Sequence, residues 1–212
     1  MRDSKLGLRA PFHLSPAIVL LCSLVPRGAA ADSCAPTLSG VTSASTASTI
    51  SLNGVNEGRS VDSTALSTAS NAWNSSCSGH DNPGFQTSGS GDMTVNVNFH
   101  SGDGPSNGFS QCDSCACTQT QVTNGAVSGA TVQMFGQQAN GSSCLGAQNE
   151  VLTHELGHVL GLGDSSCSGR IMGDVFGSIA SGDCDAVDGN FFTDAEHNTD
   201  PDGPGDDGPC AV

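Results

Sequence analysis

The chain has 212 residues and an acidic composition, with 21 acidic side chains against 6 basic ones and a formal net charge of −15 at pH 7. This length predicts one domain of ordinary size with a leader and a tail. Beyond residue 31 only Arg59 and Arg170 remain as strong bases against twenty acidic residues, a formal charge of −18. Such a charge repels phosphate backbones and anionic lipid, so we expect neither nucleic acid nor a membrane surface as partner.

The N-terminal segment 1–31 is typical of a secretory signal peptide. Three basic residues precede a short apolar run, Ala17–Val25, and three alanines at 29–31 offer a cleavage site. The run has nine residues, whereas a membrane-spanning helix needs about 20. A buried N-terminal helix is the alternative. We expect a secreted, extracellular protein that acts as a monomer.

The first half of the remaining chain predicts a strand, a helix and a second strand. The Ser/Thr/Ala-rich segment 39–51 allows a leading strand. A cap at Asp62 or Ser63 predicts a helix that runs to about residue 74. In the segment 93–99 apolar and polar residues alternate, which predicts a strand with one buried face.

The second half predicts one more strand and two helices. The same alternation recurs in 130–135, and the Gly, Ser, Asn and Cys-rich residues 100–129 before it predict a long loop. Gln148 or Asn149 begins a helix with an apolar face. A further helix is expected over about residues 184–192.

The last segment, 198–212, is acidic, rich in Gly and Pro, and too polar to fold alone. We expect it to be a solvated tail. The spacing of the oxygen-bearing side chains of Asn198, Asp200, Asp202 and Asp206 leaves a Ca²⁺ site as the alternative.

Nine cysteines lie beyond residue 31, and behind a secretory leader their default role is disulfide bonding. They are Cys34, Cys77, Cys112, Cys115, Cys117, Cys144, Cys167, Cys184 and Cys210. Cys112, Cys115 and Cys117 are close enough in sequence to hold a metal instead. Because nine is odd, one thiol is free, paired between chains or lost in processing.

The sequence HELGHVLGLGD, which begins at His154, carries the chemistry. His154 and His158 are four residues apart, so on a helix they share one face and both imidazoles can reach one cation. Glu155 lies beside them, where its carboxylate can meet a water molecule on the metal. Gly161 breaks the helix, so that Asp164 can return as a third ligand.

Zinc in hydrolases has three protein ligands and one open position. The ion lowers the pKa of its water from about 15.7 to about 7, and Glu155 would accept the proton as the water attacks a peptide carbonyl. The pattern predicts a secreted, zinc-dependent endopeptidase that acts on a protein or peptide. Its zinc ligands would be His154, His158 and Asp164, and its catalytic residue Glu155.

Three alternatives stay open at this stage. The motif could be part of a buried helix whose polar residues have other hydrogen-bond partners. Asp164 could cap a turn, which would leave Asp174, Glu196 or His197 as the third ligand. The chain could also be a non-catalytic, disulfide-rich secreted module with a structural metal site, although such a site needs no base at Glu155.

Eight residues beyond Asp164, Met172 lies in the sequence Gly-Arg-Ile-Met-Gly. The pattern HExxHxxGxxD followed by a methionine turn resembles the metzincin clan of zinc peptidases, in particular its secreted snapalysin-type and matrixin-like bacterial members. The resemblance covers about residues 60–195, and outside residues 154–172 it rests on the order of elements. It implies an α+β catalytic domain with a twisted, mostly parallel sheet, an antiparallel edge strand, a zinc helix, a Met-turn and a C-terminal helix. We expect this domain to occupy residues 32–197, between the leader and the tail.

The resemblance also implies roles for single residues. It places His154, His158 and Asp164 on zinc, makes Glu155 base and acid, and puts Met172 beneath the metal. The edge strand, which we expect at 130–135, would bind substrate by strand addition. The chain departs from the matrixin pattern, which has His in place of Asp164. Cys167 and Cys184 bracket the Met-turn, and we predict that they pair.

Overall fold

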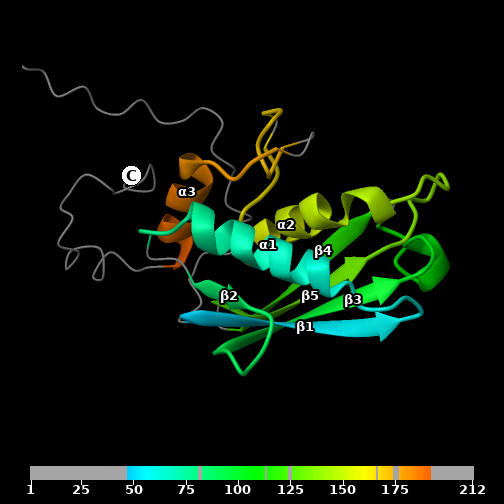
Figure 1. The fold of residues 1–212 in the computed structure, drawn as a ribbon, viewed down its shortest axis with the longest axis horizontal. Helices are drawn as coiled ribbons and strands as arrows, with labels where there is room; N and C mark the ends of the chain where they lie inside the picture. The colour runs from blue at the N-terminus through cyan, green and yellow to red at the C-terminus, as the bar shows by residue number, and fades with distance from the viewer. Residues whose placement is uncertain are drawn as a thin grey trace, which may run out of the picture. The chain divides into compact units, whose positions relative to one another are not determined.

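The computed structural model describes residues 47–80, 83–112, 114–123, 126–165, 167–173 and 177–191 (Figure 1). The expected leader at 1–31 and the acidic tail at 198–212, with its Ca²⁺ alternative, lie outside the described residues. The alternative ligands Asp174, Glu196 and His197 lie outside them too.

A five-stranded, mostly parallel sheet is the framework of the described chain. Its strands are β1 (Thr49–Glu57), β2 (Gly84–Gln86), β3 (Met93–His100), β4 (Ala116–Thr123) and β5 (Ala126–Met134). They lie in the order β2-β1-β3-β5-β4, and every neighbouring pair is parallel except β4 and β5. The predicted α+β class with a mostly parallel sheet is therefore confirmed.

The helices are α1 (Ser63–Ser76), α2 (Gln148–Val159) and α3 (Ser181–Phe191). Asp62 caps α1, since its carboxylate accepts the backbone N–H of Ala65 at 2.9 Å. Figure 1 shows α1 and α2 side by side over one face of the sheet. The three predicted helices are confirmed, and none of the described helices is long and apolar enough to cross a membrane.

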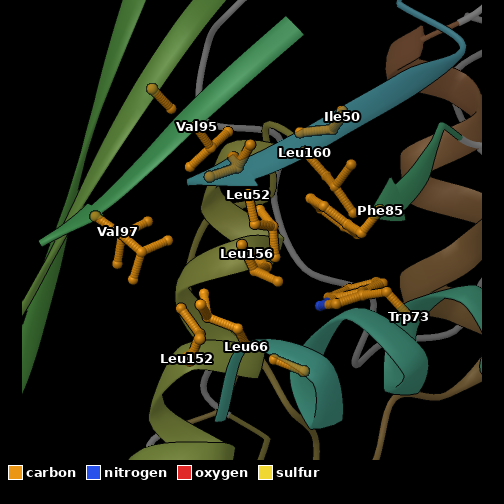
Figure 2. Close-up of a cluster of buried hydrophobic side chains, with 14 of the residues drawn as sticks. Ile50, Leu52, Leu66, Trp73, Phe85, Val95, Val97, Leu152, Leu156 and Leu160 are labelled. Atoms are coloured by element: carbon orange, nitrogen blue, oxygen red, sulfur yellow. The ribbon is translucent and has the colours of Figure 1, made fainter. Parts of the chain in front are cut away.

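The hydrophobic core lies between this face of the sheet and the two helices (Figure 2). Its larger members include Ile50, Leu52, Val95 and Val97 from the sheet, Leu66 and Trp73 from α1, and Leu152 and Leu156 from α2. The indole N–H of Trp73 donates to the backbone carbonyl of Thr153 at 2.8 Å. Burial of the apolar stripe of α2, at about 1.5–3 kcal/mol for each large side chain, sets which way this helix faces.

The antiparallel edge strand is not where we expected it. Residues 130–134 belong to β5, an inner strand that pairs with β3 on one side and β4 on the other. The edge strand is β4, which falls within the expected loop 100–129. Its sequence, ACTQTQVT, alternates Thr with Gln in the middle and has no regular alternation of apolar and polar residues, so it carries little hydropathy signal.

Three disulfides join described cysteines: Cys77–Cys184, Cys112–Cys117 and Cys115–Cys144. The alternative of a metal held by the three clustered cysteines is therefore wrong. The predicted Cys167–Cys184 pair is also wrong, because Cys184 reaches across to Cys77 at the end of α1. Cys167 is disulfide-bonded as well.

Replacing Trp73 with Phe is expected to lower the free energy of unfolding by about 1–3 kcal/mol. The substitution removes a buried hydrogen bond and leaves part of the indole volume unfilled. Urea unfolding followed by circular dichroism measures the change. Leu145→Ala is the control, because this side chain is 58% exposed and should change stability by less than about 0.5 kcal/mol. Equal effects of the two substitutions would contradict the packing described for Trp73.

Candidate metal centre

Helix α2 ends in a reversal that depends on glycine. The N–H of Gly161 donates to the carbonyl of His158, and the N–H of Leu162 donates to that of Gly157, both at 3.0 Å. These two bonds form a Schellman motif, in which the residue after the helix is left-handed. Gly161 has φ +84°, a conformation that costs glycine little. The turn sends the chain back towards the helix, so that Asp164 meets the imidazoles.

Three acceptor atoms converge at this end of α2. The Nε2 atoms of His154 and His158 lie 3.1 Å apart, and Oδ1 of Asp164 lies 3.4 Å from the first and 3.5 Å from the second. A tetrahedral ion with ligands at about 2.0–2.1 Å requires them to be about 3.3 Å apart. The structure therefore brings the three predicted ligands together at separations that suit one metal ion.

Both imidazoles are oriented by main-chain carbonyls. Nδ1 of His154 lies 2.8 Å from the carbonyl oxygen of Ile171, and Nδ1 of His158 lies 2.8 Å from that of Leu162. A carbonyl oxygen only accepts, so each Nδ1 carries a proton and each ring turns its Nε2 inward. Carbonyls that hold metal-binding histidines in this way set both the tautomer and the ring orientation.

Two imidazole nitrogens and a carboxylate oxygen thus converge on one point, where a metal ion would bind all three. Two nitrogens and one carboxylate oxygen are a ligand set that zinc uses in hydrolases. The side chains of His154 and His158 are 11% and 25% exposed, whereas that of Asp164 is 73% exposed. The centre therefore has a buried side on α2 and an open side at the aspartate.

Glu155 is buried beside the cluster and is held from the edge strand. The hydroxyl of Thr118 on β4 donates to Oε2 of Glu155 at 2.7 Å and lies 3.2 Å from the Glu155 carbonyl oxygen. Burial raises the pKa of the Glu155 carboxyl, and the Thr118 hydrogen bond and the charges of His158 and His154 oppose this rise.

The segment after Asp164 returns to α2, and its residue Met172 packs against the helix. Met172 is fully buried, and its carbonyl accepts the N–H of Ser165. A Cβ built on Gly157 would overlap with Sδ of Met172 and would lie 3.2 Å from Cζ2 of Trp73. A glycine at position 157 thus lets Met172 and Trp73 approach the helix one residue before His158.

A cavity of about 470 Å³ opens over the cluster. One wall comes from β4 and the residues before it, and the other comes from α2 and the turn after it. Its lining includes Ala116, Cys117, Thr118 and Thr120 on the first side, and His154, Glu155, His158, Leu162, Gly163 and Asp164 on the second. The cavity is large enough for part of a peptide chain next to the candidate ligands.

All four predicted site residues lie together, and one residue that was not predicted, Thr118, contacts Glu155. Thr118 went unnoticed because its strand was expected to be a loop. A single threonine between cysteines and glutamines carries no motif of its own. Its position becomes informative only when β4 is placed above α2.

Comparison of the chain with protein-family models and with curated protein sequences finds no match.

Gly157→Ala is expected to destabilise the protein by about 1–3 kcal/mol, because the added methyl group must displace fully buried neighbours. The alanine's higher helix propensity, about 1 kcal/mol, offsets only part of this cost. Gly146→Ala is the matched control, since a Cβ there meets no atom within 4 Å. Thermal unfolding of both variants decides the matter, and an unchanged midpoint for Gly157→Ala would refute the contact with Met172.

Proposed function

We propose that this chain is a secreted, zinc-dependent endopeptidase whose zinc ligands are His154, His158 and Asp164. One observation carries the proposal. Ligand atoms of these three residues lie within 4.8 Å of one another, at the wall of an open cavity and beside the buried Glu155 carboxylate. Hydrolytic zinc sites combine such a ligand set with a neighbouring general base.

A bound zinc ion would supply a water molecule of lowered pKa and positive charge for the developing oxyanion. Glu155 takes the proton from the attacking water and passes it to the leaving amine. Burial supports the first half of this role, because a raised pKa makes the carboxylate a stronger proton acceptor. The carbonyls of Ile171 and Leu162 keep both imidazoles in the required tautomer.

Strand β4 is the proposed substrate-binding edge. It is the last strand in the sheet order, and it pairs with β5 on one side only among the described strands. The main-chain groups of its other edge can therefore bond an extended peptide, which would lie along the cavity that β4 borders. For this reason we assign to β4 the substrate binding by strand addition that was expected of residues 130–135.

The resemblance to metzincin peptidases supports the same function. A mostly parallel sheet with one antiparallel edge strand, the two-histidine helix, the glycine turn and a buried methionine beneath the helix follow in the implied order. We therefore propose a metzincin-type catalytic domain over residues 32–197, with Met172 in the Met-turn.

The alternative, a structural metal site in a non-catalytic module, is less consistent with the geometry. Structural zinc sites have four protein ligands, whereas three ligand residues group here among the described residues. Asp164 is largely exposed, and the cavity reaches the cluster. A buried carboxylate at position 155 also has no role in a purely structural site.

The disulfides support secretion, because such bonds persist in oxidising compartments outside the cytosol. We propose that residues 1–31 direct export and are then removed.

The purified protein is expected to hydrolyse an unfolded protein substrate, to lose this activity with a zinc chelator and to regain it with zinc. Glu155→Gln should retain zinc and lower kcat by about 10²–10⁴-fold, because it cannot accept a proton. Glu150→Gln, on the exposed side of the same helix, should leave kcat unchanged. Zinc-loaded Glu155→Gln protein with full turnover would refute the assigned role.

Asp164→Ala is expected to weaken zinc binding by more than about 100-fold, because even residues that only support metal ligands contribute about 10- to 100-fold. Metal analysis and competition with a chromophoric chelator measure the affinity. Asp103→Ala, at another loop aspartate whose carboxylate accepts the N–H of Ser106, should bind zinc as the wild type does. Wild-type affinity in Asp164→Ala would remove this residue from the ligand set.

A further inference from the structure

The Glu155 carboxylate has one hydrogen-bond donor among the described residues, and that donor is Thr118. The bond of 2.7 Å ends on Oε2. A threonine hydroxyl carries a single proton, so the shorter contact to Oε2 takes it, and the 3.2 Å contact to the main-chain oxygen of Glu155 is secondary. The side chain of Glu155 also lines the cavity.

The donor is anchored by the sheet and by two disulfides near the start of β4. Thr118 pairs with Val132 in the sheet and follows Cys117, which is bonded to Cys112. Cys115, three residues earlier in the chain, is bonded to Cys144 just before the Leu145–Ala147 turn that leads into α2. The start of β4 is therefore fixed relative to the helix it contacts, and the hydroxyl of Thr118 is fixed with it.

We propose that Thr118 is a positioning residue that aims the Glu155 carboxylate at the reacting water. This inference rests on the proposed peptidase function and adds to it a link between two parts of the site. The strand that borders the substrate cavity also holds the general base, so one rigid element sets the position of both. Thr118 itself takes no proton and forms no bond to substrate.

Loss of the hydroxyl should therefore lower turnover and leave substrate binding intact. Thr118→Val preserves the shape of the side chain and removes the donor. We expect kcat to fall by about 10- to 100-fold, in line with the cost of a small misplacement of a catalytic group, with KM within about twofold. Thr118→Ser restores the donor and should return kcat to within about threefold of the wild type.

Thr94→Val is the matched control, because Thr94 is exposed on β3 and does not line the cavity. It should leave kcat and KM unchanged. If Thr118→Val does not fold, Thr118→Ala carries the same test. Zinc affinity, measured by chelator competition, should be equal in the wild type and both Thr118 variants, because Thr118 does not contact the three ligands.

Crystal structures of zinc-loaded wild type and Thr118→Val supply a readout independent of turnover. We expect the Glu155 carboxylate in one orientation in the wild type, bonded to Thr118, and turned or in several conformers in the variant. An unmoved carboxylate together with an unchanged kcat would overturn the inference and leave the peptidase function standing. A rise in KM at constant kcat would overturn it too, because it would make Thr118 a substrate contact. A wild-type protein that binds zinc but cleaves nothing would overturn the proposed function, and the crystal structures would still decide whether Thr118 orients Glu155.

Discussion

The arrangement of the centre depends on two hydrogen bonds, each between an imidazole Nδ1 and a backbone carbonyl. They turn the Nε2 atoms of His154 and His158 towards each other and towards Asp164. The carbonyls belong to Leu162, in the turn directly after α2, and to Ile171, nine residues further along the chain. The ligand cluster can therefore form only when the chain has reversed at Gly161 and then returned beneath the helix. Local sequence spacing makes the pair of histidines, and tertiary structure makes the site.

Helix α2 is held by contacts from three other parts of the chain close to the ligand cluster. Trp73 bonds one of its carbonyls, Met172 packs on Gly157, and Thr118 contacts Glu155 from the sheet edge. Each of these contacts lies within one turn of a candidate ligand. A small shift of α1, of the segment that carries Met172 or of β4 would move the imidazoles or the carboxylate. The residues that pack this helix therefore also position the candidate site.

The helices and the site could be predicted largely from sequence because their signals are local. Asp62 as a cap, the apolar stripe of α2 and the His-Glu-His spacing each involve residues within a few turns of one another. Gly161 also marked the end of the helix correctly. The order of the strands in the sheet was harder to predict. The periodicity of a strand shows which of its faces is buried, but it does not show which other strand lies beside it.

The errors concern the edge strand and the cysteines. Strand β4 is polar because one of its edges and part of its surface are open, and hydropathy therefore grouped it with the loop before it. The Cys77–Cys184 bond depends on α1 and α3 lying together, which proximity in sequence could not indicate. Thr118 was not predicted because of the first of these errors. A donor to Glu155 can be recognised only after the strand that carries it has been placed.

The bond between Cys77 and Cys184 spans 107 residues, an interval that contains β2 to β5 and the whole of α2. It closes this part of the chain into a covalent ring. Cleavage of one peptide bond in any loop within the ring would leave the two fragments joined by this disulfide and still packed against each other. In surroundings rich in proteolytic enzymes, such a molecule could be clipped at its surface and remain in one piece.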